Sequence, residues 1–212
     1  MAYLGLESIR QGNTAACVKD IFTLHFPDAR TVLDTTYGAG RFWKWDHHLA
    51  VTGVDISPQN EGVLKADYRN LPFTEDTFDV MCFDPMFIFS PGISRVMGTK
   101  RFFEWSDDAS IQMLVRPKNP IDLLSHYRRI FEQRTIATQG LILKGQDLIV
   151  NKPDWWSFNV MEMAREMGMG MPTDILIQHS PSPRMRDPRW KNQYHFRRAH
   201  CYYLIYRWGE SQ

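Results

Sequence analysis

The chain has 212 residues, of which 43% are hydrophobic and 23% charged, and this composition excludes a disordered protein. The formal net charge of +1 indicates neither an acidic nor a basic partner. Cys17, Cys82 and Cys201 lack the CxxC spacing of zinc sites, so we expect free thiols, no metal and a reducing, cytoplasmic environment. No signal peptide, lipidation motif or long apolar stretch is found, so we expect a single domain over 1–212 and no membrane contact.

Apolar runs bounded by turn residues predict helices and strands that alternate along the chain. A first helix is expected over 14–26, capped by Asn13 or Thr14 and ended by Pro27, with later helices at about 120–133 and 156–167. Seven strands are expected, at 31–34, 50–55, 63–66, 78–83, 139–144, 174–179 and 200–207. This alternation predicts an α/β fold with a Rossmann-like, doubly wound, mostly parallel sheet that binds ligands at its carboxyl edge.

The segment VLDTTYGAG joins a buried strand to a glycine-rich turn. Asp34 ends the strand, and Gly38 and Gly40 permit a positive φ and a close approach of the backbone to a ligand. A helix is expected to begin near Arg41, with its N-terminal amides directed at the same place. The G-A-G spacing lacks the later glycine of the dinucleotide fingerprint, so it favours a nucleoside-bearing cofactor over a nicotinamide or flavin dinucleotide. The alternative is a tight connection that binds nothing.

Three further acidic residues stand at or after the ends of expected strands. Asp55 ends the second strand, 21 residues after Asp34, where a carboxylate can accept hydrogen bonds from both ribose hydroxyls. Asp67 follows the third strand, and Asp84 follows the fourth in the sequence FDVMCFDPMF. Each of these acids alone fits a helix cap or a solvated loop. Together, on the edge of the sheet that binds ligands, they predict a functional site.

Several of these segments resemble the class I S-adenosylmethionine-dependent methyltransferases, and more narrowly the DNA methylases that modify N6 of adenine or N4 of cytosine. DTTYGAG is similar to the cofactor loop of that family, GVDIS to its ribose-binding strand end, KADYRNLPF to its adenine-holding segment and DPMF to its catalytic tetrapeptide. GLILKGQD and RRAHCYYLIYRW resemble its fifth and closing strands. Met86 departs from the pattern, because it stands where the family has a second proline.

The resemblance implies S-adenosylmethionine as the cofactor and a last strand that is antiparallel to its neighbours. It also implies a set of cofactor contacts, with the last two residues at the methionine end: Asp34, Thr36, Tyr37, Gly38, Gly40, Asp55, Ile56, Asp67, Tyr68, Asn13 and Thr14.

The tetrapeptide DPMF contains the groups that methylation of an aromatic amine requires. An exocyclic amine on a heteroaromatic ring is a poor nucleophile because its lone pair is delocalised. Hydrogen bonds from this amine to the Asp84 carboxylate and the Pro85 carbonyl would favour a pyramidal nitrogen and direct its lone pair at the methyl group. Phe87 would stack on the acceptor ring. The alternative is a core strand that ends in an ordinary Asp-Pro turn.

Basic residues with interleaved aromatics gather near the end of the chain, where Arg184 to Arg207 include seven Arg or Lys and one acid. A loop over 180–199 is therefore expected to contact nucleic acid. A segment over 90–110 follows the tetrapeptide and could close over the acceptor as a lid. The alternatives are a solvated basic loop and a disordered crossover. The predicted contacts of these two segments are Lys100, Arg101, Arg184, Arg186, Arg189, Trp190 and Lys191.

We therefore expect methylation of an amino group of adenine or cytosine, in DNA rather than RNA. The chain has no room for a separate target-recognition region, which indicates loose sequence specificity, a small or structured RNA target, or recognition supplied by a partner subunit or a homodimer. Two alternatives stay open. The acceptor could be RNA, a small molecule or a protein side chain, or the chain could be a non-catalytic partner subunit that binds S-adenosylmethionine.

Overall fold

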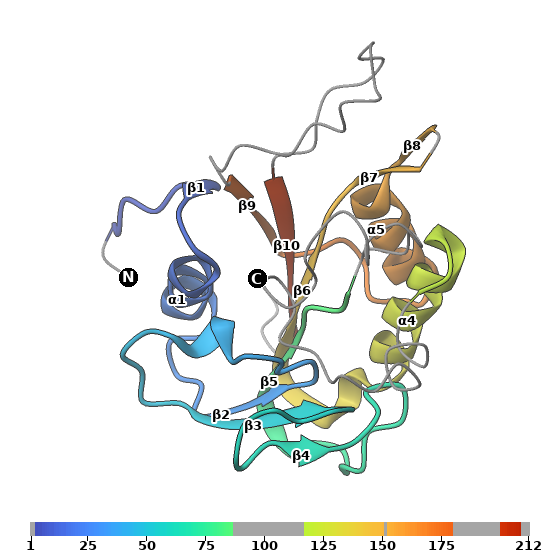
Figure 1. Cartoon of the computed structure of the whole chain (residues 1–212). Helices are drawn as coiled ribbons and strands as arrows, with labels where there is room; N and C mark the ends of the chain where they lie inside the picture. The colour runs from blue at the N-terminus through green and yellow to red at the C-terminus, as the bar shows by residue number, and fades with distance from the viewer. Residues whose placement is uncertain (1–2, 87–116, 151, 180–199, 209–212) are drawn as a thin grey trace, which may run out of the picture.

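A computed structural model of the protein describes residues 3–86, 117–150, 152–179 and 200–208. Eight strands form one sheet in the order β1-β9-β10-β6-β5-β2-β3-β4 (Figure 1). These strands are β1 (Ile9–Gln11), β2 (Thr31–Asp34), β3 (Ala50–Asp55), β4 (Leu64–Lys65), β5 (Phe78–Phe83), β6 (Ala137–Gly145), β9 (Asp174–His179) and β10 (His200–Arg207). Neighbouring strands are parallel except at β10, which is antiparallel to both β6 and β9. The predicted α/β fold with an antiparallel last strand is confirmed.

Helices cover both faces of the sheet, as a doubly wound fold requires. Helix α1 (Thr14–His25) lies on one face, while α4 (Pro120–Glu132) and α5 (Trp156–Glu166) lie on the other (Figure 1). Successive side chains of a strand point to opposite faces, so alternate residues enter different cores. The core under α4 and α5 contains Leu33, Met81, Leu141, Leu143 and Leu204. The core under α1 contains Val32, Val80, Cys82, Ile142 and Ile205.

Two helices begin at asparagine caps that the sequence makes recognisable. Asn13 Oδ1 accepts a 2.9 Å hydrogen bond from the backbone N–H of Ala16, so Asn13 rather than Thr14 caps α1. Asn119 Oδ1 accepts a 2.9 Å hydrogen bond from the backbone N–H of Asp122 and caps α4 in the same way. Helices α1, α4 and α5 each end one residue before the predicted limit.

The structure corrects three details of the predicted elements. The main sheet has eight strands rather than seven, because Ile9–Gln11 pairs with β9 at the edge, and three residues are too few to show a periodic pattern. A short hairpin, β7 (Leu148–Val150) with β8 (Lys152–Asp154), was also not predicted. Only a single 3-10 turn, η1 (Arg41–Trp43), stands where a helix was expected. The indole of Trp43 bonds to Asp34 and that of Trp45 to the Phe42 carbonyl, and these contacts hold the segment in a tight turn.

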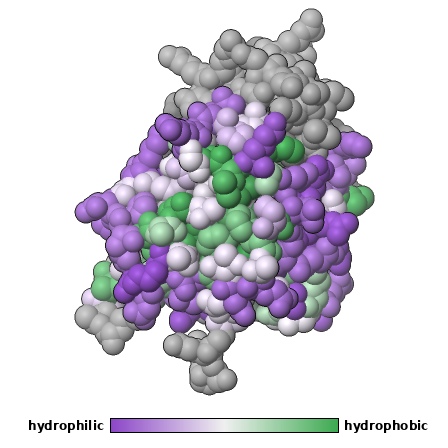
Figure 2. Space-filling view, turned by 90° about the horizontal axis from the view of Figure 1, so that it is seen from below, coloured by the Kyte–Doolittle hydropathy of each residue, from purple (hydrophilic) through white to green (hydrophobic). Residues whose placement is uncertain are grey.

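On the face of the molecule seen in Figure 2, an apolar area is surrounded by hydrophilic residues. Within the described part of the chain, no helix is long and apolar enough to cross a membrane. The same residues contain no cluster of three or more His, Cys, Asp or Glu side chains that could hold a metal ion.

Cys17 is buried, and burial raises the pKa of its thiol to about 11, so it remains protonated at neutral pH.

Candidate active site

The strand order reverses at β2, which has β3 on one side and β5 on the other. In open α/β sheets, ligands bind beyond the carboxyl ends of the strands at such a reversal. Asp34 ends β2, and Asp84 directly follows β5. Asp34 lies two residues after Val32, and Asp84 two after Cys82, so both side chains lie on the α1 face of the sheet. The fold therefore brings two predicted site residues to the position where a ligand is expected.

The glycine turn after β2 has the predicted backbone conformation, with φ of 51° at Gly38 and 63° at Gly40. Gly38 N–H donates a 3.0 Å hydrogen bond to Asp55 Oδ2, and the other carboxylate oxygen accepts a 2.8 Å bond from Ser57 N–H. Asp55 thus joins the turns after β2 and β3. A Cβ on Gly40 would lie 2.8 Å from Tyr37 Oη, because the Tyr37 ring covers this glycine.

Asp34 is buried beneath this turn. Its carboxylate accepts a 2.7 Å hydrogen bond from Trp43 Nε1 and a 3.1 Å bond from Thr36 N–H. Burial raises the pKa of Asp34 to about 7, although these two hydrogen bonds act in the opposite direction. The neighbouring charges of Asp84 and Asp55 raise this pKa further. A gathering of carboxylates favours a cationic ligand.

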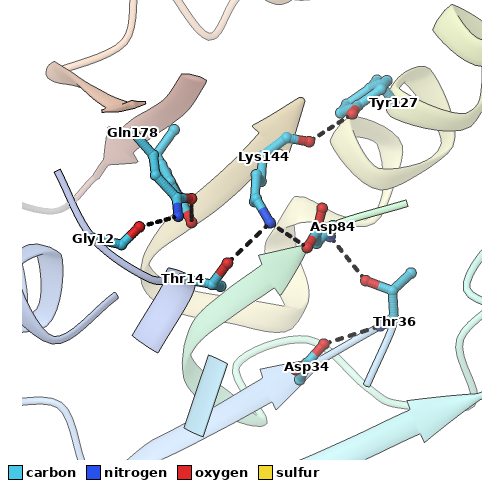
Figure 3. Close-up of polar contacts among 9 residues, drawn as sticks. Gly12, Thr14, Asp34, Thr36, Asp84, Tyr127, Lys144 and Gln178 are labelled. Carbon is cyan, nitrogen blue, oxygen red and sulfur yellow. Dashed lines mark hydrogen bonds and ion pairs between the residues drawn. The ribbon is translucent and has the colours of Figure 1, made fainter. Parts of the chain in front are cut away.

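The end of β5 is attached to the end of β2 by backbone and hydroxyl contacts (Figure 3). The backbone N–H of Asp84 donates a 2.8 Å hydrogen bond to Thr36 Oγ1, and Thr35 Oγ1 donates a 2.8 Å bond to the Cys82 carbonyl. Pro85 is buried directly after Asp84. Thr36, expected as a cofactor contact, therefore also joins the two strand ends.

A lysine that the sequence analysis did not select lies within this site. Lys144 Nζ forms a 2.8 Å ion pair with Asp84 Oδ2 and lies 3.4 Å from Thr14 Oγ1 (Figure 3). Lys144 is the only charged residue in β6, which covers 137–145. A charge within such a run is a signal that could have identified it, since buried charges need partners.

Among the other predicted cofactor residues, some lie in the core, some are occupied by contacts within the protein, and one lies beside Lys144. Burial alone raises the pKa of Asp67, but hydrogen bonds from Arg69 to both carboxylate oxygens outweigh it, and the pKa lies below its ordinary value. Tyr68 is 6% exposed and bonds to His126 Nδ1 over 2.9 Å, so its ring belongs to the core. Ile56 is partly buried against the same core. Asn13 is occupied as a helix cap, while Thr14 lies beside Lys144.

The remaining predicted residues lie outside the described part of the chain, as do both loops at 90–110 and 180–199. They are Phe87, Lys100, Arg101, Arg184, Arg186, Arg189, Trp190 and Lys191.

A scan against models of known protein families finds no match, and a search of curated proteins finds none either. Among solved structures, the Burkholderia thailandensis 1,6-didemethyltoxoflavin-N1-methyltransferase with bound 1,6-didemethyltoxoflavin and S-adenosylhomocysteine has a TM-score of 0.52. It is 13% identical, over 92% of this chain and 77% of its own. The delta-N METTL16 MTase domain has a TM-score of 0.42 and 8% identity, over 91% of this chain and 79% of its own. A SAM dependent methyltransferase from Aquifex aeolicus has a TM-score of 0.37 and 12% identity, over 91% and 97%.

Only the first of these similarities has a score above 0.5, and it shows that the chain has the fold of a class I methyltransferase.

Proposed function

We propose that the protein is an S-adenosylmethionine-dependent methyltransferase that acts on an exocyclic amino group of a nucleobase. The observation that carries this proposal is the position of Asp84 and Pro85. They follow β5 at the reversal of strand order, beside the glycine turn and Asp34. This arrangement would place an amine acceptor next to the cofactor.

The residues at the turn fit S-adenosylmethionine, whose sulfonium and ammonium groups are both positively charged. Asp34, Asp55 and Asp84 place three carboxylates near one another, and among the described residues only Lys144 forms an ion pair with any of them. Each oxygen of Asp55 accepts one backbone N–H, which leaves lone pairs for the ribose hydroxyls. A Cβ on Gly38 would have no neighbour closer than the Thr36 carbonyl oxygen at 3.9 Å, so the backbone is open to a ligand there. The related fold from Burkholderia was solved with S-adenosylhomocysteine bound.

The cofactor would supply a methyl group on a sulfonium, and this chain's residues would align the acceptor with it. Asp84 and the Pro85 carbonyl would each accept an N–H of the amine, which directs the nitrogen lone pair at the methyl carbon. The amine nitrogen would gain the new C–N bond, and the electron pair of the broken C–S bond would remain on the sulfur of the cofactor. The methylated amine would then be a strongly acidic cation, so Asp84 would accept its extra proton and pass it to solvent.

A nucleobase in DNA is the first acceptor to test, because DPMF resembles the DNA amino-methylases most closely. A small heteroaromatic molecule is the second candidate. It is favoured by the Burkholderia enzyme of similar fold, which is named for methylation at N1 of 1,6-didemethyltoxoflavin.

The proposal is tested by incubating the protein with methyl-labelled S-adenosylmethionine and separate pools of DNA, RNA and free nucleosides. Digestion and nucleoside analysis then identify the modified base. We expect N6-methyladenine or N4-methylcytosine with the unaltered chain and a large loss with Asp84→Asn. Label on a carbon atom or on a hydroxyl would show that the amine mechanism is wrong. Cofactor binding without transfer to any pool would favour a non-catalytic subunit.

A further inference from the structure

Lys144 is a partly buried lysine at a place where the fold does not require a charge. Its side chain is 11% exposed and follows Ile142 on the α1 face of the sheet. Burying an ammonium group is costly, and apolar residues of similar volume often stabilise a core better than a buried ion pair does. A role in stability is therefore a weak explanation for Lys144.

The position of the ammonium group is fixed from several sides. It contacts Asp84 Oδ2 and Thr14 Oγ1, and it lies 5.6 Å from the ring centroid of Phe42 and 5.7 Å from that of Tyr203. Aromatic faces attract cations at such distances. The Tyr127 hydroxyl donates a 2.7 Å hydrogen bond to the Lys144 carbonyl and holds the backbone from the opposite face (Figure 3). Because the Lys144 side chain is fixed in this way, it can in turn fix the orientation of the Asp84 carboxylate.

The surroundings also determine the protonation state of Lys144. Burial alone lowers the pKa of its ammonium group, but the carboxylate of Asp84 raises it, and the pKa lies above its ordinary value. Lys144 therefore remains a cation at neutral pH in the absence of ligands. It is a hydrogen-bond donor and a fixed positive charge rather than a general base.

The two oxygens of Asp84 have different surroundings. Oδ2 is bound by Lys144, whereas Oδ1 accepts no hydrogen bond from any residue in the described ranges. A free carboxylate can rotate, and its two oxygens would then compete for one donor. An ion pair through Oδ2 stops this rotation, so that Oδ1 can accept a hydrogen bond from the acceptor.

We infer that Lys144 is a positioning residue that fixes Asp84 through Oδ2, so that Oδ1 is directed at an amino N–H of the acceptor. The inference rests on the proposed function and adds the residue that orients its carboxylate. Lys144 itself exchanges no proton and forms no bond with the acceptor.

The test compares Lys144→Met, Lys144→Arg, Asp84→Asn and the double variant Asp84→Asn/Lys144→Met in the full chain. Lys19→Met, an exposed lysine of α1, is the matched control and should behave like the unaltered protein. We expect Lys144→Met to bind S-adenosylmethionine within about threefold of normal while kcat falls about 100-fold, the scale for losing one preorganised group. Lys144→Arg, which keeps the positive charge, should restore the rate in part.

The double variant separates positioning from an independent role. Once Asp84 is replaced, loss of Lys144 should change kcat by less than about threefold, because residues that act as a unit are not additive. A further drop of about 100-fold would overturn the inference, as would a normal kcat in Lys144→Met or a loss confined to cofactor affinity. If Lys144→Met does not fold, the effect of losing Lys144 can still be measured by comparing kcat of Asp84→Asn with kcat of the double variant, in which both residues are uncharged. No transfer by the unaltered protein would reject the proposed function, and the inference with it. Normal transfer by both the unaltered protein and Lys144→Met would reject the inference alone.

Discussion

The indole N–H of Trp43 donates a 2.7 Å hydrogen bond to the buried carboxylate of Asp34, and this bond joins the 3-10 turn to the end of β2. We expect Trp43→Phe to lower the free energy of unfolding by about 1–3 kcal/mol at pH 8, because a buried carboxylate loses a donor. The loss should be smaller at pH 5, where Asp34 is protonated. Urea denaturation at both pH values measures it. Trp45→Phe is the control, since the Trp45 indole bonds to the Phe42 carbonyl and its loss should not vary with pH.

Asp34 should also make the stability of the whole protein depend on pH. Its pKa is about 7 in the folded state and 3.8 in the unfolded chain, so the folded state binds the proton more tightly. The resulting stabilisation is fully present below pH 3.8 and is lost as the pH rises through about 7. Asp34→Asn removes this dependence. We expect the variant to gain on the order of 2–4 kcal/mol relative to the unaltered protein between pH 4 and pH 8. The free energies of unfolding of Asp34→Asn and of the unaltered protein are measured by denaturation from pH 4 to pH 8. A constant difference between the two over this range would contradict the raised pKa of Asp34.

The same carboxyl group should link cofactor binding to proton release. A cation that binds beside Asp34 favours its ionised form, so the affinity for S-adenosylmethionine should increase from pH 6 to pH 8. Calorimetry in buffers with different ionisation enthalpies would detect about half a proton released per cofactor at pH 7, as expected for a group that titrates near this pH. Asp34→Asn should bind more weakly and release none. Affinity that is independent of pH would place the cofactor's positive charges away from Asp34.

The elements near the site could be predicted because their physical signals are local. The strand ends at Asp34 and Asp55 and the left-handed glycines at 38 and 40 follow from apolar runs and from the conformational freedom of glycine. Asn13 was one of two cap candidates, because an asparagine directly before a helical run can accept a hydrogen bond from the first turn, as it does in α1.

The contacts that define the site depend on residues far apart in the sequence, and no local pattern encodes them. Lys144 meets Asp84 across 60 positions, and Tyr68 is drawn into the core by His126 across 58. Trp43 forms its bond to Asp34 only because the chain turns tightly, where a simple glycine-to-helix rule predicted a longer helix. In each case tertiary packing determined the outcome.

Gly38→Val should impair cofactor binding more than folding. The φ of 51° at this residue is unfavourable for a β-branched side chain, and such strain costs about 1–3 kcal/mol. Gly168→Val is the matched control, because Gly168 has a φ of 77° and open space around it but lies beyond α5. We expect similar losses of thermal stability in the two variants, whereas only Gly38→Val should lose S-adenosylmethionine binding by calorimetry. Normal binding by folded Gly38→Val would contradict the assignment of the glycine turn.

Replacement of Asp84 should separate catalysis from cofactor binding, and the ion pair determines which replacement is informative. Asp84→Ala leaves the partly buried Lys144 ammonium without its carboxylate, and the resulting loss of stability confounds an activity measurement. Asp84→Asn keeps an oxygen that can accept from Lys144 but loses the negative charge. We expect methyl transfer by Asp84→Asn to fall by about two to three orders of magnitude, the scale for loss of one preorganised electrostatic group. Cofactor affinity should stay within a few-fold of normal, and thermal denaturation should show Asp84→Asn to be more stable than Asp84→Ala. If Asp84→Asn transferred methyl groups at the full rate, the carboxylate would not be the acceptor's partner, whatever the cofactor.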